Sequence, residues 1–187
     1  MRNSMIAAAL TLAPLSAVVA DEVSERKQQS VAVVQEFMGE LKGHLEKAMK
    51  SGGPVSAIGV CNQIAPTVAQ EQSDKHGWKV GRTSLRLRNP GNAPDVWERK
   101  VLEQFDARRA AGEDPATMAH AEVVEQDGGR TFRFMKAIPT GEVCLKCHGQ
   151  EIPAPVGAKL NELYPEDRAT GYNLGEIRGA FTITQPM

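Results

Sequence analysis

Two cysteines separated by two residues and followed at once by a histidine form the segment with the most specific chemistry. The segment reads Cys144-Leu145-Lys146-Cys147-His148. Two thiols at this spacing can reach the two vinyl groups on one edge of a porphyrin, while the adjacent imidazole approaches the iron from one face. The pattern therefore predicts one covalently bound haem c, attached to Cys144 and Cys147, with His148 as an axial iron ligand.

Two other kinds of site use the same residue types. A thioredoxin-like redox pair would start a helix after a strand of a βαβ unit, whereas the strand expected here belongs to a hairpin. A zinc site could draw on Cys61, Cys144, Cys147 and His148, which are suitable types for four-coordination. Because the neighbours Cys147 and His148 do not readily turn toward one ion, the haem interpretation is favoured.

The third cysteine, Cys61, cannot form a disulfide within the chain if the other two are thioethers. It lies on the apolar stripe of a predicted helix, where a free cysteine is often a small buried side chain. Its thiolate could equally be the second axial ligand of the iron. The residues alone leave both readings open. Other side chains that could supply this ligand are Met118, Met135, His44, His76 and His120.

Three arginines alternate along a segment that we expect to be extended. Arg82, Arg86 and Arg88 would then share one face of a strand. Guanidinium groups pair well with carboxylates, and haem carries two propionates. A solvated basic strand edge would produce the same pattern.

The N-terminal 20 residues have the composition of an export signal. Arg2 precedes an apolar run over residues 5–19, which is short for a membrane span, and small residues end at Ala20. We expect cleavage of residues 1–20 and a mature chain in the periplasm that begins near Asp21. An uncleaved membrane anchor is the alternative. No later segment resembles a membrane span.

Size and charge limit the classes of function. The whole chain has 187 residues and a formal net charge of −1. Residues 21–187 suit one domain that can bury a core without metal or disulfide staples. No basic surplus argues for a nucleic-acid partner, and no block of charge argues for a membrane surface.

The elements that must position these residues predict an α+β fold. An amphipathic helix over residues 21–50 ends at Ser51-Gly52-Gly53, and a second helix begins at Pro54 and carries Cys61. Pro66 is expected to kink or end that second helix. A third helix spans about residues 94–111. The stripe of the first helix consists of Val31, Val34, Met38, Leu41, Leu45 and Met49.

Extended segments are expected at about residues 78–87, 119–125 and 130–138, with a last strand around residues 177–183. Gly81 is a possible bulge in the first of them. Asp127-Gly128 is a strong hairpin turn signal between the second and third. Hairpins with few crossovers favour an antiparallel sheet with helices packed on it.

Several segments together resemble a known family: residues 60–66, 81–84, 88–98, 144–149, 164–165, 171–172 and 175–180. They are similar to a c-type haem family with a PAS-like fold, long catalogued as a domain of unknown function. The resemblance covers nearly all of the expected mature chain. It implies an antiparallel sheet flanked by helices, and a haem held by His148 and, on its other side, by a cysteine at the position of Cys61. Family members are regarded as redox or gas sensors.

Three functions are compatible with such a haem. A sensor of redox state or of a small diatomic molecule could work by ligand exchange, because loss of the Cys61 sulfur from the iron would release its helix. A periplasmic electron-transfer cytochrome is the alternative, and it needs a redox partner protein. A peroxidase-like enzyme would need an open distal site with an acid–base residue, which Cys61 would block. We expect a sensor without enzymatic activity, which signals through a separate partner.

Overall fold

The computed structural model describes residues 15–126 and 128–187. Of the expected export signal, residues 1–14 lie outside the described residues, and residues 15–20 belong to the start of the first helix. Residue 127 of the predicted hairpin turn also lies outside them.

Four strands form one antiparallel sheet in the spatial order β1-β4-β3-β2. The second and third strands form the predicted hairpin, in which Gln126 lies opposite Gly129. Gly128 has a φ of 77°, as a two-residue hairpin turn requires. The last strand of the chain then inserts between β3 and β1. The strands are β1 (Lys79–Thr83), β2 (Ala119–Gln126), β3 (Gly129–Pro139) and β4 (Ile177–Pro186).

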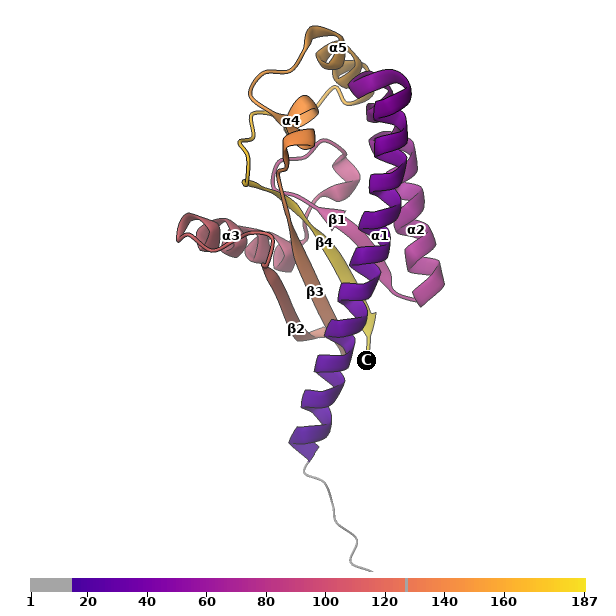
Figure 1. Cartoon of the computed structure of the whole chain (residues 1–187). Coiled ribbons are helices and arrows are strands. Elements are labelled where there is room, and N and C mark those ends of the chain that lie inside the picture. Colours follow the sequence, from indigo (N-terminus) through magenta and orange to yellow (C-terminus); the bar gives the residue numbers. More distant parts are fainter. Residues whose placement is uncertain (1–14, 127) are drawn as a thin grey trace, which may run out of the picture.

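Helices cover both faces of this sheet (Figure 1). The long helix α1 (Leu15–Gly59) lies along one face, with α2 (Ala65–His76) beside it. The helix α3 (Val96–Ala110) crosses the other face. These observations confirm the α+β class and the antiparallel sheet flanked by helices.

Two apolar clusters hold the layers together. On the α1 face, Phe37 is fully buried and its ring meets that of Phe181 edge-on at 5.2 Å between centroids. On the α3 face, Phe105 packs with Met118 and Met135, which are all fully buried. The alternation of Phe132, Phe134 and Ile183 toward one face is the period-2 pattern that defines a packed strand.

The predicted helix end at Ser51-Gly52-Gly53 is a sharp kink inside α1. Gly53 has φ 67° and ψ −160°, and the helix resumes at Pro54. A residue with a side chain rarely adopts such a φ, so the glycine permits the change of direction.

Of the two outcomes predicted for Pro66, a kink or an early end, the helix does not end there but has an irregular turn directly before it. A π-helical turn, η1 (Val60–Ile64), precedes it, and the helix continues through α2 to His76. The N–H group of Ala65 bonds to the carbonyl oxygen of Val60, five residues back. Pro66 therefore lies in the first turn of α2, directly after the π-turn, where the irregular helical spacing accommodates a residue without an N–H group.

The first strand is shorter than predicted. It ends at Thr83, because the Ser84 hydroxyl bonds to the backbone of Arg86 and turns the chain out of the sheet. Arg86 and Arg88 therefore lie in a loop and not on a strand face with Arg82. Gly81 pairs regularly with Thr182 and is not a bulge. The register shift lies instead between β3 and β4, where Ile138 pairs with Gly179 and Pro139 with Ile177, so that Arg178 of β4 has no partner on β3.

Two short helices follow β3. The cysteine–histidine segment forms α4 (Glu142–His148), and α5 (Ala154–Leu163) comes next. Figure 1 shows both at the same end of the sheet, beside the kinked end of α1. Within residues 15–126 and 128–187, no helix has both the length and the apolar composition needed to cross a membrane.

We predict that Gly179→Ala destabilises the protein, because β1 and β4 approach too closely there for a side chain. A Cβ atom at Gly179 would overlap the Thr83 carbonyl oxygen and lie 3.2 Å from Cβ of Ser84. Overpacking of this kind costs about 2 kcal/mol of the free energy of unfolding, measured by urea denaturation. Gly81→Ala is the matched control, since its Cβ would meet only a methyl group of Thr182 at 3.8 Å. Equal stability of the two variants would contradict the prediction.

Candidate haem site

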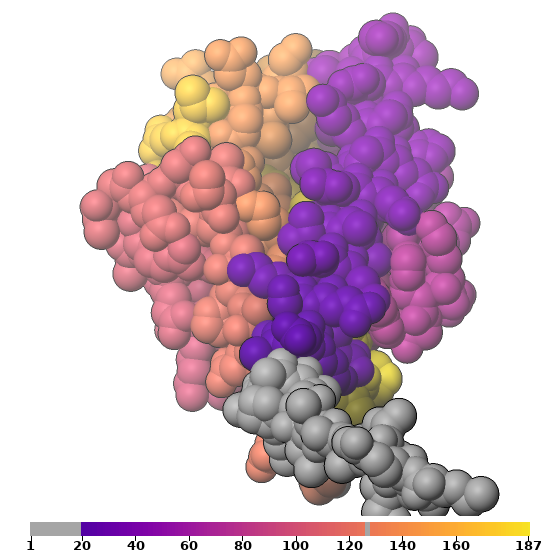
Figure 2. All heavy atoms as spheres, turned by 60° about the horizontal axis from the view of Figure 1, so that its bottom comes forward, coloured from indigo at the N-terminus to yellow at the C-terminus, as the bar shows by residue number. Residues whose placement is uncertain are grey.

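The residues predicted to bind haem line one cavity between α1, η1 and α4. Cys61, Cys144, Cys147 and His148 all face it. The space measures about 250 Å³, and its wall is mainly apolar. Figure 2 shows the molecular surface hollowed between α1, in indigo, and the orange segment that includes α4. A largely apolar cavity with a few converging polar groups is typical of a cofactor site.

The apolar stripe predicted for the first helix forms much of this wall. Met38, Leu41, Leu45 and Met49 line the cavity, although none of them is fully buried. The side chains of α1 that pack against the sheet lie beside this stripe, and Phe37 is the most buried of them. The helix therefore has two apolar surfaces, one packed against the sheet and one lining the cavity.

The short helix α4 places the three motif side chains on one face. Positions 144, 147 and 148 are related as i, i+3 and i+4, which lie together on a helix surface. All three cysteines of the chain are free thiols and half-buried. Burial raises the pKa of the Cys147 thiol.

The imidazole of His148 is held in one orientation. Its Nδ1 atom lies 2.6 Å from the carbonyl oxygen of Ala169, so Nδ1 carries the proton and donates it. The Nε2 atom then carries the lone pair, toward which Nη1 of Arg88 points at 3.2 Å and Nη1 of Arg178 at 3.4 Å. Burial, followed by the charges of Arg178 and Arg88, lowers the pKa of His148 to about 2. The ring is therefore neutral, in the form that binds a metal through Nε2.

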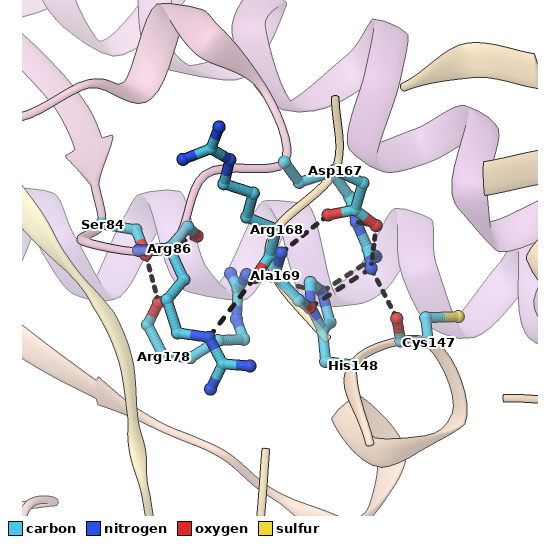
Figure 3. Close-up of polar contacts among 9 residues, drawn as sticks. Ser84, Arg86, Cys147, His148, Asp167, Arg168, Ala169 and Arg178 are labelled. Atoms are coloured by element: carbon cyan, nitrogen blue, oxygen red, sulfur yellow. Dashed lines mark hydrogen bonds and ion pairs between the residues drawn. The ribbon is translucent and has the colours of Figure 1, made fainter. Parts of the chain in front are cut away.

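A buried ion pair supports this histidine from the loop at residues 167–169 (Figure 3). Arg88 donates to the Asp167 carboxylate at 2.9 Å and to the carbonyl oxygen of Cys147 at 2.6 Å. Both charged side chains are less than 10 % exposed, at 8 % and 7 %. Asp167 also accepts the backbone N–H of Ala169 at 2.8 Å. The pair thus ties the end of α4 to the carbonyl group that orients His148.

Arg86 has a different environment from the one that its spacing predicts. Its guanidinium carbon lies 4.2 Å from the centroid of the Tyr172 ring, and its Nε donates to the Arg168 carbonyl at 3.3 Å. No local sequence pattern indicates the roles of Asp167 and Ala169, because both act through contacts with residues far away in the chain.

The other candidate ligands lie elsewhere. Met118 and Met135 belong to the core on the α3 face. His44 is exposed, His76 stacks on Trp78, and His120 lies 3.4 Å from the Glu122 carboxylate. Of the candidates for a second axial ligand, Cys61 shares the cavity with His148.

A zinc site is not formed. Across the described part of the chain, no three His, Cys, Asp or Glu side chains are grouped to hold a metal ion.

We predict that Asp167→Ala lowers the free energy of unfolding by about 3 kcal/mol, because it leaves the Arg88 guanidinium buried without its counter-ion. Urea denaturation followed by circular dichroism measures the loss. Glu113→Ala is the control, since it removes the partner of Arg108 in an exposed ion pair and should lose much less. Similar losses in the two variants would show that the buried pair does not support the site.

Comparison with known proteins places the chain in a family. A family model described as Tll0287-like matches residues 7–186. A search of curated proteins gave no match. Among solved structures, the crystal structure of the cyanobacterial heme-protein Tll0287 matches with a TM-score of 0.68 and 24% sequence identity, over 87% of this chain and 96% of that one. The family resemblance drawn from the sequence segments is confirmed, and the chain belongs to the Tll0287-like family.

Proposed function

We propose that this protein is an exported haem protein with one haem c attached to Cys144 and Cys147 and with iron bound by His148 and Cys61. The observation that carries the proposal is the single apolar cavity onto which these four side chains converge. Its family relative Tll0287 is described as a heme-protein, which supports the same cofactor class here.

The residues present fit this cofactor. Bound haem would supply reversible one-electron exchange and an iron site for small ligands. The α4 thiols would form the thioether attachments, and the neutral Nε2 of His148 would bind the iron. The bond from Nδ1 to the Ala169 carbonyl would fix the ring and raise the basicity of Nε2. The side chains of α1 would exclude water from one side of the site.

Export is part of the proposal. Covalent haem attachment of this type takes place outside the cytoplasm, and the first 20 residues have the composition of a cleaved signal. We therefore assign the mature chain, residues 21–187, to the periplasm as one haem domain.

A sensing role follows from the position of Cys61. The residue lies in the π-helical turn η1, which joins α1 to α2. Single π-turns within helices are frequent at functional sites, and they hold one residue more than an α-helical turn. A change of ligand at Cys61 would therefore act on the irregular turn that joins the two helices. That change would move α2 relative to α1, which is the two-state element that a redox or diatomic-gas switch requires.

The same geometry argues for a role without enzymatic turnover. A peroxidase-type reaction needs an acid–base histidine beside an open iron position. Among the described residues, His148 is the histidine that lines the cavity, and Cys61 would occupy the second position.

An electron carrier is the second candidate, and the rim of the cavity favours it. Met38 and Val143 line the cavity and are 50% and 49% exposed. An apolar rim of this kind would leave a haem edge near the surface, where a redox partner protein could approach.

The covalent attachment is tested by the intact mass of protein produced in a host with cytochrome c maturation. We expect the mass of residues 21–187 plus one haem, and loss of covalent haem in the Cys144→Ala/Cys147→Ala variant. A colourless wild-type protein with the mass of the bare polypeptide would overturn the proposal.

The second ligand is tested by the electron paramagnetic resonance spectrum of the ferric protein. We expect Cys61→Ala to change the spectrum, because the iron loses a sulfur ligand. Met135→Leu, a volume-conserving change in the core, should leave the spectrum as in the wild type. Coincident spectra of wild type and Cys61→Ala would exclude the thiolate.

The same samples after reduction distinguish sensor from carrier. Binding of carbon monoxide or nitric oxide by the reduced wild type supports sensing. Unchanged ligation on reduction, with a potential well above zero, supports electron transfer and contradicts the switch at η1.

A further inference from the structure

Two arginines beside the cavity differ from the other buried arginines of the protein. Arg88 is paired with Asp167, and Arg133 is paired with Asp95 at 2.7 Å. Arg82 and Arg178 also line the cavity, yet neither has a carboxylate partner within the described residues 15–126 and 128–187. These two side chains bring positive charge to an otherwise apolar site.

Neighbouring strands of the sheet bring the two arginines to the wall of the same cavity. Arg82 lies on β1 opposite Phe181 of β4, and Arg178 lies at the start of β4. The close approach at Gly179 and a bond of 2.8 Å from the Ser84 hydroxyl to the Arg178 carbonyl join the two strands there. Burial and the charge of Arg178 lower the pKa of Arg82 to about 10.

Both arginines also line a smaller space that adjoins the apolar cavity. This space measures about 50 Å³ and shares Cys61 and His148 with the larger cavity. Its remaining lining is more polar and includes Ser84, Asn89 and Asn92. A ligand that fills both spaces would have an apolar body and an anionic end.

We propose that Arg82 and Arg178 bind the two haem propionates, an inference that rests on the proposed haem site. The propionates lie on the porphyrin edge opposite the vinyl groups, so attachment at α4 directs them away from Cys144 and Cys147. Two like charges that line one largely apolar cavity are costly, and two carboxylates would offset that cost.

The position of Arg178 is consistent with this exchange of partners. Its Nη1 atom lies 3.4 Å from Nε2 of His148, the nitrogen that would bind iron. Nη1 of Arg88 lies 3.2 Å from the same nitrogen, and iron bound there would displace both guanidinium groups. Arg88 would keep its partner Asp167, whereas a propionate would give Arg178 the carboxylate partner that it lacks among the described residues. The assignment replaces Arg86 and Arg88 of the sequence prediction, because Arg86 is held by Tyr172 and Arg88 by Asp167.

The test compares haemin with haemin dimethyl ester, which lacks both carboxylates. Binding is measured by absorbance titration in the Cys144→Ala/Cys147→Ala background, where no covalent bond forms. We expect the Cys144→Ala/Cys147→Ala protein to bind haemin roughly tenfold or more tightly than the ester, because hydrogen bonds to charged groups are strong. Adding Arg82→Gln/Arg178→Gln should abolish the preference. Adding Arg99→Gln/Lys100→Gln removes the same charge from exposed positions on α3 and should preserve it.

Equal affinity for haemin and the ester in the background protein would overturn the assignment and leave the haem site standing. A colourless wild-type protein would instead overturn the haem site itself.

The Cys144→Ala/Cys147→Ala protein could bind neither porphyrin although the wild type carries haem. In that case, the reduction potential of the protein with covalently attached haem tests the assignment. We expect Arg82→Gln/Arg178→Gln to make the potential rise as the pH falls, because freed propionates would take up protons. A potential with the same pH profile as that of Arg99→Gln/Lys100→Gln would contradict the proposal.

Discussion

The hydrogen bond from His148 to the Ala169 carbonyl sets the geometry on which the proposed site depends. A buried imidazole must be neutral, and its one N–H group must find a partner. Because the Ala169 carbonyl accepts a hydrogen bond from Nδ1 at 2.6 Å, the lone pair on Nε2 is the one that could bind iron. The buried pair of Arg88 and Asp167 then fixes the loop that presents this carbonyl group. In the proposed site, this short helix would thus present two thiols and one oriented imidazole to the haem.

The opposite wall of the cavity depends on the length of α1. This helix packs on the sheet through Phe37 and neighbouring side chains, and its kinked end at Gly53 leads to the π-turn that carries Cys61. Any movement of Cys61 therefore acts on a helix that spans the sheet. His148 is held rigidly, whereas Cys61 lies in a less regular helical turn. In the proposed ligand-exchange switch, His148 would stay on the iron and Cys61 would be the ligand that leaves.

The sequence predicted the parts that depend on local patterns. Hairpin chemistry at residues 127–128, the helix break at Gly53 and the motif at residues 144–148 each have a short-range physical cause. The π-turn was not predicted, because a proline such as Pro66 usually ends or kinks a helix. Here the extra residue in η1 lets the helix continue past the proline. The strand was predicted too long because Ser84 turns the chain through contacts with Arg86 and Arg178. The roles of Asp167 and Ala169 could not be predicted, since they depend on contacts across 79 and 21 positions in the chain.

The central claim is that His148 and Cys61 share one haem iron. The most direct measurement is an anomalous difference map, recorded at the iron absorption edge from crystals of the mature protein. The account predicts one iron peak in the cavity, within bonding distance of both His148 Nε2 and Cys61 Sγ. An iron bound to His148 with Cys61 out of bonding distance in the oxidised protein, or no iron in the cavity, would contradict it.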